Sequence, residues 1–268
     1  MIDGGKQNIL GVLVDAVDYE AAVERIMAAA RDREPYAVSA LAVHGVMTGV
    51  QDPAHRHRLN HLDLVCPDGQ PVRWALNLLH HSALPDRVYG PNLTLKVCER
   101  AAQEKLPVYL YGSQPETLEA LAHRLRIRMP DLIIAGMQPS RFRHISPEEK
   151  IDIIREIGDS KAAIVLVGLG CPRQEVWVYE FRNELSMPLL AVGAAFDFHA
   201  GRMPQAPKAM QNLGLEWLFR FVHEPARLWK RYLLLNPHYL CLIALQALGW
   251  RSFDPKRTVH PDREVLYG

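Results

Sequence analysis

The stretch AAIVLVGLGCPRQEVWVYEF, residues 162–181, decides the fold class of this 268-residue chain. Its first six residues, Ala162–Val167, are continuously apolar, which is typical of a strand buried on both faces of a parallel sheet. The loop Gly168–Glu175 follows, and the residues after it have the apolar spacing of a helix. A strand, a loop and a helix in this order form most of a βαβ unit.

Five other short apolar runs predict further strands of the same kind: Tyr36–Leu41, Leu62–Cys66, Val108–Tyr111, Leu132–Ala135 and Leu189–Val192. Between them, Ser113–Glu116 and Ser146–Glu149 have the pattern of a capping box, in which a serine and a glutamate close the first turn of a helix. Strands that alternate with helices predict an α/β fold with a Rossmann-like, mainly parallel sheet that is flanked by helices.

The C-terminal part of the chain has a different pattern. The alternation fades after Val192, and the last strongly helical region is expected over Leu213–Leu248. We therefore predict a Rossmann-like domain at residues 1–205 and a basic helical appendage at residues 206–268. From residue 208 onward, nine basic and five acidic residues give a net charge of +4, whereas the whole chain has +1. This asymmetry favours an anionic partner surface, and a solvated basic face on a packed helix is the alternative.

Composition excludes several classes of protein. With 31 basic and 30 acidic residues, the chain lacks the positive charge expected of a general nucleic-acid binder. Its four cysteines form no CxxC pair, so neither a disulfide framework nor a cysteine zinc site is predicted. The sequence begins without a signal-peptide pattern and has no apolar run long enough to span a bilayer, so we expect a cytoplasmic protein.

Four segments have residues suited to chemistry, because ligands of a doubly wound sheet bind beyond the carboxyl ends of its strands. In one of them, Phe196–Gly201 with Pro204–Pro207 and Gly214–Arg220, aromatic and charged residues interleave with helical spacing, and a core-packed helix end is the alternative. Asp68 follows a predicted strand and can act as a general base; a common Pro-Asp-Gly turn is the alternative. Gly168–Glu175 can present a helix N-terminus to a phosphate, and a tight turn is the alternative. Arg87, beside a glycine turn, can clamp a phosphate or a carboxylate, and an ordinary surface arginine is the alternative.

Other familiar sites are not predicted. Gly168 and Gly170 fit the start of a dinucleotide fingerprint, but Arg173 stands in place of the third glycine. No Walker motif, no Gly-x-Ser-x-Gly elbow and no Asp-x-Asp triplet occurs in the sequence. His55 and His57 are two residues apart, so they do not face the same way on a helix, and we predict neither a metal nor a cofactor.

Six segments resemble a known family: DLVCPDGQPV (63–72), DRVYGPNL (86–93), VYLYGS (108–113), VGLGCPRQE (167–175), VGAAFDFHAGRMPQAP (192–207) and GLEWLFRFVHEPARLWKRYLLLNP (214–237). In this order and spacing they are similar to the WecG/TagA/CpsF family of bacterial glycosyltransferases. The resemblance covers residues 9–245.

The resemblance implies a transferase that moves a hexose-type sugar from a UDP-sugar to a polyprenyl-diphosphate-linked sugar, for cell-surface or exopolysaccharide biosynthesis. It implies a peripheral location on the inner face of the cell membrane, where arginines of the appendage complete the site. The expected catalytic residues are Asp68, as the base, and Arg87. Together, the resemblance and the glycine loops give these predicted substrate-binding residues: Gly69, Gly112, Ser113, Gly168, Gly170, Gln174, Arg220, Arg227 and Arg231. A homo-oligomer is compatible with the sequence.

Three segments depart from the family's pattern. The family often has Thr-x-Asn where this chain has Ala40-Leu-Ala42, an arginine in place of Gln205, and an aromatic loop in place of Gln138–Phe142. The donor sugar, the acceptor sugar and the linkage therefore stay unidentified. A nucleotide-binding regulator or scaffold of a polysaccharide assembly complex is the alternative function, and a nicotinamide dehydrogenase is disfavoured by the incomplete fingerprint.

The expected reaction inverts the anomeric centre by direct attack. Asp68 accepts the proton of an acceptor hydroxyl, and UDP leaves with charge growing on its β-phosphate. Without a metal, that charge has to be stabilised by N–H groups at the helix start near Pro172–Gln174 and by an arginine, either Arg87 or one from the appendage.

Overall fold

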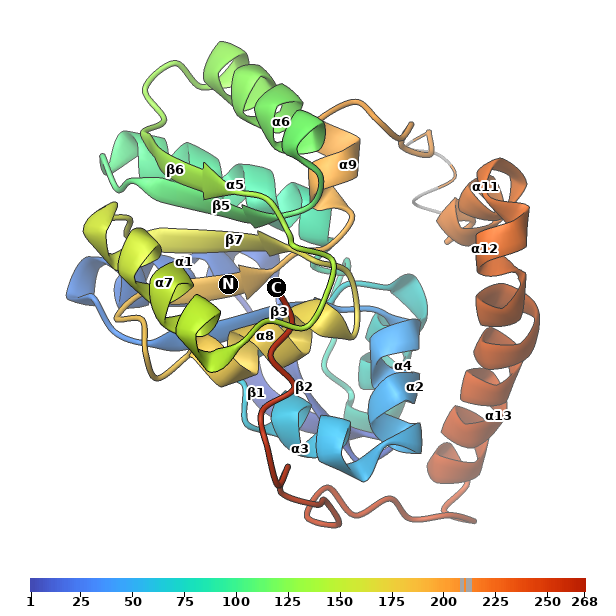
Figure 1. Cartoon of the computed structure of the whole chain (residues 1–268). Helices are drawn as coiled ribbons and strands as arrows, with labels where there is room; N and C mark the ends of the chain where they lie inside the picture. The colour runs from blue at the N-terminus through green and yellow to red at the C-terminus, as the bar shows by residue number, and fades with distance from the viewer. Residues whose placement is uncertain (208–209, 211–213) are drawn as a thin grey trace.

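The computed structural model describes residues 1–207, 210 and 214–268, and the side chains of Arg220, Arg227, Lys230, Arg231 and Tyr232 lie outside the description. Six parallel strands form the central sheet in the order β4-β3-β8-β7-β5-β6 (Figure 1). Their bounds are β3 (Tyr36–Leu41), β4 (Leu64–Pro67), β5 (Val108–Gly112), β6 (Ile134–Gln138), β7 (Ile164–Gly168) and β8 (Pro188–Ala191). Each overlaps one predicted apolar run, so the predicted α/β fold with a Rossmann-like sheet is confirmed.

The sheet is buried on both faces, because successive side chains of a strand point to opposite sides. In β7, Val165 and Val167 belong to the core on one face, and Ile164 and Leu166 belong to the core on the other. This double burial explains why the strand is continuously apolar rather than alternating.

Helices cover both faces and produce three layers (Figure 1). One face is covered by α1 (Tyr19–Asp32), α5 (Gly90–Gln103), α6 (Pro115–Arg128) and α9 (Ala195–His199). The other face is covered by α2 (Val43–Gln51), α3 (Pro53–Asn60), α4 (Gln70–His80), α7 (Pro147–Asp159) and α8 (Arg173–Phe181). The helices thus leave the carboxyl edge of the sheet to the loops.

An antiparallel hairpin that the sequence did not predict lies beside β4. It consists of β1 (Asp3–Ile9) and β2 (Val12–Val17). Buried Asp15 accepts the Val65 N–H at 2.8 Å, and this burial raises the pKa of its carboxyl. The hairpin was missed because β1 is polar and contains two glycines, which are poor strand formers.

One of the two predicted capping boxes is confirmed. Ser146 accepts the Glu149 N–H, and the Glu149 carboxylate accepts the Ser146 N–H at 2.9 Å, so both close the first turn of α7. The prediction at Ser113 is wrong, because the residue that precedes α6 as its N-cap is Gln114, which forms no side-chain cap. Ser113 instead has a φ of 62° at the end of β5.

The appendage is helical, as predicted, and its residues from 216 onward form a short helix followed by three helical segments that continue into one another (Figure 1). They are α11 (Glu216–His223), α12 (Pro225–Trp229), the π-helix η1 (Lys230–Leu235) and α13 (Asn236–Ala247). The break between α11 and α12 falls at residue 224, before Pro225 opens α12, and Pro237 is the second residue of α13. The domain boundary near residue 205 lies between α9 and α11 and stays a prediction.

Helix α13 and the chain after it pack on the body. Tyr239 is buried, and its hydroxyl donates to the Pro71 carbonyl at 3.2 Å, while Leu242 and Ile243 join the core beside α4. The segment 253–268 then returns across the body, where the Glu180 carboxylate accepts the N–H groups of Val265 and Leu266 at 2.7 and 2.9 Å. The appendage is therefore anchored to the body through α13 and through its C-terminal segment.

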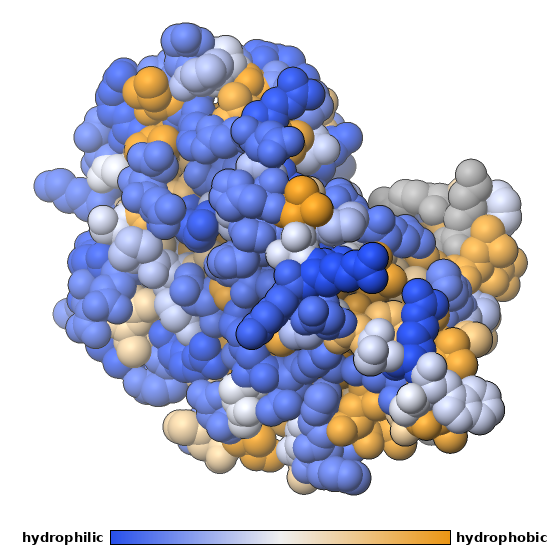
Figure 2. Space-filling model, turned by 90° about the horizontal axis from the view of Figure 1, so that it is seen from below, coloured by the Kyte–Doolittle hydropathy of each residue, from blue (hydrophilic) through white to orange (hydrophobic). Residues whose placement is uncertain are grey.

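Apolar side chains are gathered on the side of the molecule that carries the appendage (Figure 2). On the appendage helices and the turn after them, those at least two fifths exposed are Val222, Trp229, Leu233, Leu234, Leu240, Leu248 and Trp250. Within the described ranges, no helix is long and apolar enough to cross a membrane.

Candidate active site

The larger of two neighbouring cavities lies at the carboxyl edge of the sheet. The connections from β5 and β7 leave toward opposite edges of the sheet there, which is the usual place for a ligand crevice. This sheet-edge cavity has a volume of about 530 Å³. Its lining comes mainly from the ends of β3, β5, β7 and β8 and includes Ala40, Ala42, His44, Asp68, Ser113, Phe142, Gly168, Gly170, Gln174, Glu175, Gly193 and Asp197.

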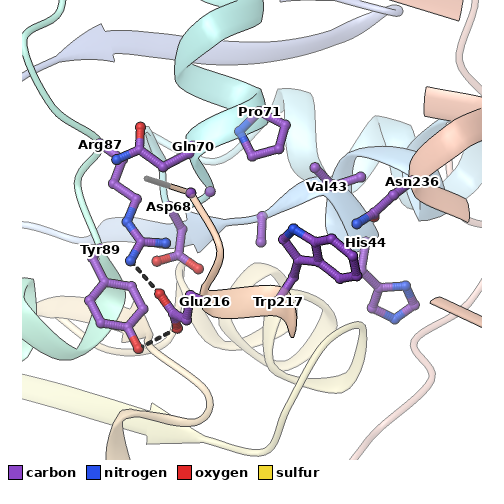
Figure 3. Close-up of a pocket in the computed structure, with 13 residues that line it drawn as sticks. Val43, His44, Asp68, Gln70, Pro71, Arg87, Tyr89, Glu216, Trp217 and Asn236 are labelled. Atoms are coloured by element: carbon purple, nitrogen blue, oxygen red, sulfur yellow. Dashed lines mark hydrogen bonds and ion pairs between the residues drawn. The ribbon is translucent and has the colours of Figure 1, made fainter. Parts of the chain in front are cut away.

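The smaller cavity, of about 110 Å³, lies between the body and the appendage (Figure 3). This appendage cavity is lined by Ala42, Val43, His44, Asp68, Gly69, Gln70, Pro71, Arg87, Tyr89, Gly214, Glu216, Trp217 and Asn236. Three residues, Ala42, His44 and Asp68, line both cavities. The two cavities therefore share a wall, and Asp68 supplies the carboxylate on it.

Asp68 is held at this wall by its neighbours on two sides. Its N–H donates to the Leu41 carbonyl at 3.2 Å, and its Oδ1 accepts the Gly90 N–H, at the start of α5, at 2.7 Å. The alternative of an ordinary Pro-Asp-Gly turn is wrong, because Gly69 has a φ of −93° and serves as the N-cap of α4 rather than taking a positive φ. The carboxylate is thus held on the wall between the two cavities, and its role as a general base stays a prediction.

Arg87 is buried in the wall of the appendage cavity, so the alternative of a surface arginine is wrong. Its guanidinium forms an ion pair with Glu216, the first residue of α11, and lies 4.1 Å from the centre of the Tyr89 ring. The Tyr89 hydroxyl donates to the other Glu216 oxygen at 2.7 Å (Figure 3). One carboxylate therefore joins the appendage to two residues of the body.

Burial and neighbouring charges determine the protonation states of Arg87 and Tyr89. Burial by itself would lower the pKa of Arg87, but the carboxylates of Glu216 and Asp68 outweigh it and raise the pKa above the ordinary value. Burial and the nearby Glu216 carboxylate also raise the pKa of Tyr89. Arg87 is thus a permanent cation, and Tyr89 is a neutral hydrogen-bond donor.

The loop between β7 and α8 forms a second hydrogen-bonded group. The Gly170 N–H donates to Gln174 Oε1 at 3.1 Å, and Gln174 Nε2 donates to Glu175 Oε1 at 2.9 Å. Ser39 on β3 donates to the same Glu175 oxygen at 3.1 Å. The Glu175 side chain is fully buried, which raises its pKa. These contacts tie the glycine loop to β3, which lies two strands away from β7 in the sheet.

Gly168 is required by packing rather than by a turn. A Cβ added to it would lie 2.5 Å from the Phe196 ring, and one added to Gly112 would lie 2.9 Å from the Gly168 backbone. At Gly170, by contrast, a Cβ would meet nothing within 4 Å, but its φ of 78° favours glycine. The glycines thus let two strand ends approach closely below the cavity.

Most of the predicted site residues lie at the two cavities. Ser113, Gly168, Gly170 and Gln174 line the sheet-edge cavity, Gly69 and Arg87 line the appendage cavity, and Asp68 lines both. Gly112 is not among the described lining residues of either cavity. Arg220, Arg227 and Arg231 were predicted to bind substrate, and their side chains lie outside the described part of the chain.

The N–H donors expected at the start of α8 are partly engaged within the loop itself. The Gln174 N–H donates to the Gly170 carbonyl at 3.0 Å, and the Gly170 N–H is bonded to the Gln174 side chain. Among the described residues, no three His, Cys, Asp or Glu side chains come together as a metal site. Metal-independent activity stays a prediction.

The residues that sequence analysis missed are Tyr89, Glu175, Glu216 and Trp217, and all four line a cavity. Each lies inside or beside a quoted segment, so position in a motif was an available signal. No local signal pairs Glu216 with Arg87, because 129 residues separate them.

Comparison with known families adds an independent observation. The sequence model of the glycosyl transferase WecG/TagA/CpsF family matches residues 7–252. The matched range contains the walls of both cavities and the appendage helices. Residues 253–268, which return across the body, lie outside it.

Proposed function

This chain belongs to the WecG/TagA/CpsF family of glycosyl transferases, and we propose that it transfers a hexose-type sugar from a UDP-sugar to a polyprenyl-diphosphate-linked sugar. Family membership supports glycosyl transfer in cell-surface polysaccharide synthesis. The observation that supports the finer proposal is the position of Asp68, on the wall shared by two cavities.

The sheet-edge cavity is the better candidate for the nucleotide-sugar, because its volume is larger and its walls include small residues and backbone. The appendage cavity is then the place for the acceptor sugar. It borders Trp217 and Asn236 of the appendage, whose helices also carry exposed apolar side chains. An acceptor hydroxyl that enters from this side meets Asp68 before it meets the donor.

In the proposed reaction, the acceptor oxygen attacks the anomeric carbon of the donor while Asp68 takes its proton. The new carbon–oxygen bond forms as the bond to the β-phosphate breaks, so UDP leaves and the anomeric centre is inverted. Proton transfer to a positioned carboxylate contributes about 10²–10⁴-fold to such a rate. Arg87 is the one arginine or lysine among the described residues that line the appendage cavity with Asp68, and it is suited to stabilise diphosphate charge.

The appendage supports a peripheral position on the inner face of the cell membrane. Its basic residues attract an anionic surface with about 1 kcal/mol for each Lys or Arg near the lipid. Its exposed leucines and tryptophans can enter the interface. We propose that Arg220, Arg227 and Arg231 act with this surface at the acceptor's diphosphate.

One observation favours the alternative of a regulator without turnover. Ala40 and Ala42 line the sheet-edge cavity with methyl groups where the family often has hydroxyl and amide side chains. A panel of UDP-sugars, assayed for UDP release with a short-chain polyprenyl-diphosphate sugar, separates the two functions. The proposal expects UDP release with at least one donor that depends on the acceptor. Binding of UDP-sugars without any release would support the regulator instead.

A further inference from the structure

We propose that Glu216 occupies, on Arg87, the place that a diphosphate takes during turnover, so that the carboxylate and the substrate compete for one guanidinium. This inference rests on the proposed function, because it assumes that a diphosphate enters the site. It assigns Glu216 a positioning role that acts through Arg87.

The charge of the appendage cavity carries the argument. Among its described lining residues, Arg87 is the one permanent cation, and Asp68 and Glu216 are both carboxylates. A wall with two acids and one base repels a diphosphate, although the proposed reaction brings a diphosphate close to Asp68. Release of Arg87 from Glu216 would supply the missing cation.

Of the two carboxylates in this cavity, Glu216 is the one that pairs with Arg87, and it can lose this contact and still keep a hydrogen-bond donor. Its two oxygens have different donors: Oε1 accepts from the Tyr89 hydroxyl, and Oε2 accepts from Arg87. The carboxylate therefore keeps a donor after Arg87 moves to a phosphate, which limits the cost of leaving a buried charge unpaired. Asp68 is fixed by the Gly90 N–H at 2.7 Å and is needed as the base.

The exchange would couple substrate entry to the appendage. Glu216 begins α11, whereas Arg87 and Tyr89 belong to the body, so one buried ion pair spans the two parts. The diphosphate can come from two sources, the UDP of the donor or the lipid of the acceptor. Both present the same chemistry to a guanidinium.

The test is calorimetric titration of the full chain with UDP and, separately, with farnesyl diphosphate, a short polyprenyl diphosphate without a sugar. Glu216→Gln keeps the size of the side chain and removes its charge. We expect it to bind one of the two probes about fivefold to tenfold more tightly than the wild type, because no carboxylate competes for Arg87. The probe that responds identifies the source of the diphosphate.

Two further variants show whether the gain acts through Arg87. Arg87→Gln should weaken binding of the same probe, and adding Glu216→Gln to it should then have no effect, since the two residues act as one unit. Glu119→Gln, at an exposed position of α6, is the matched control and should leave both affinities unchanged.

If Glu216 has only a structural role, Glu216→Gln should weaken the binding of the probes or leave it unchanged. Weaker or unchanged binding of both probes by a folded Glu216→Gln chain, as judged by its thermal unfolding, would overturn the inference. If that variant does not fold, Glu216→Asp keeps the charge but shortens its reach, and a smaller gain is expected; a loss again overturns the inference. A wild-type chain that binds neither probe contradicts the proposed function itself, which is a distinguishable outcome.

Discussion

The two cavities that meet at Asp68 are built in different ways. The sheet-edge cavity is formed mainly by strand ends whose register the sheet fixes, and among its described lining residues only Leu228 comes from the appendage. The appendage cavity depends on Glu216, Trp217 and Asn236, which reach it from a separate group of helices. A binding site in the first cavity can therefore exist in the body alone, whereas the second exists only while α11 is docked.

The largest expected effect separates the two cavities through membrane binding, which should depend on the appendage and not on the sheet-edge cavity. Leu233→Glu combined with Leu234→Glu changes two residues that are 56% and 60% exposed, so the fold should persist. Burial of a leucine contributes about 1.5 kcal/mol or more, so we expect vesicle binding and transfer to a vesicle-bound acceptor to fall about a hundredfold. UDP affinity should not change. Co-sedimentation with anionic vesicles and UDP calorimetry measure both quantities.

Ile151→Glu is the matched control for this pair, because Ile151 is 55% exposed on α7, away from the appendage helices α11, α12 and α13 (Figure 1). Wild-type binding should weaken as salt rises, since charges are screened beyond about 8 Å at physiological ionic strength. Vesicle binding by the double variant at the wild-type level would contradict the proposed role of the appendage in membrane binding.

A second variant attacks the sheet-edge cavity alone. Gly168→Ala places a Cβ 2.5 Å from the Phe196 ring, and such overpacking costs about 1–3 kcal/mol. Because Gly168 lines the cavity, we expect UDP affinity to fall about tenfold, which corresponds to about 1.4 kcal/mol. Vesicle binding should stay intact. Gly158→Ala, on α7 where the added Cβ meets nothing within 4 Å, is the control, and equal UDP affinity in both variants would count against this cavity as the donor site.

A smaller effect is expected where α13 joins the body. Tyr239→Phe removes the hydrogen bond to the Pro71 carbonyl, which is typically worth about 1 kcal/mol. The melting temperature should fall by about 2–4 °C for a chain of this size. The KM for the acceptor should rise more than the KM for the donor, because Pro71 lines only the appendage cavity among the two. Equal changes in the two KM values would show that docking of α13 does not affect the acceptor site more than the donor site.

The smallest expected effect is that of a chelator. We predict that EDTA leaves turnover unchanged, since backbone donors and arginines are proposed to hold the diphosphate. Loss of UDP release on chelation, restored by Mg²⁺ or Mn²⁺, would contradict the prediction.

The same contrast explains how far sequence analysis reached. The six strands were predictable because burial on both faces makes each of them continuously apolar. The carboxyl ends of parallel strands share one edge, so the position of Asp68 and of the Gly168 loop followed from the strands. The sheet-edge cavity is thus largely readable from local patterns.

The appendage cavity could not be predicted from local sequence patterns. Its ion pair joins Arg87 to Glu216 across 129 residues, and neither side chain has a local feature that names the other. The β1–β2 hairpin was not predicted for a related reason: its polar first strand pairs with β2, and β2 in turn is bonded to β4 through Asp15 and Val65, so no local pattern marks the first strand. At Ser113 the sequence matches a capping box, but the residue has a positive φ at the end of β5 and does not cap α6.

The central claim is that Asp68 is the base between a donor and an acceptor cavity, and Asp68→Asn tests it most directly. An asparagine can still accept the Gly90 N–H through its side-chain oxygen, so folding and UDP affinity should stay nearly unchanged. UDP release that depends on the acceptor should fall at least about a hundredfold, the lower range for a lost general base. Turnover at the wild-type rate by a folded Asp68→Asn chain would contradict the assignment.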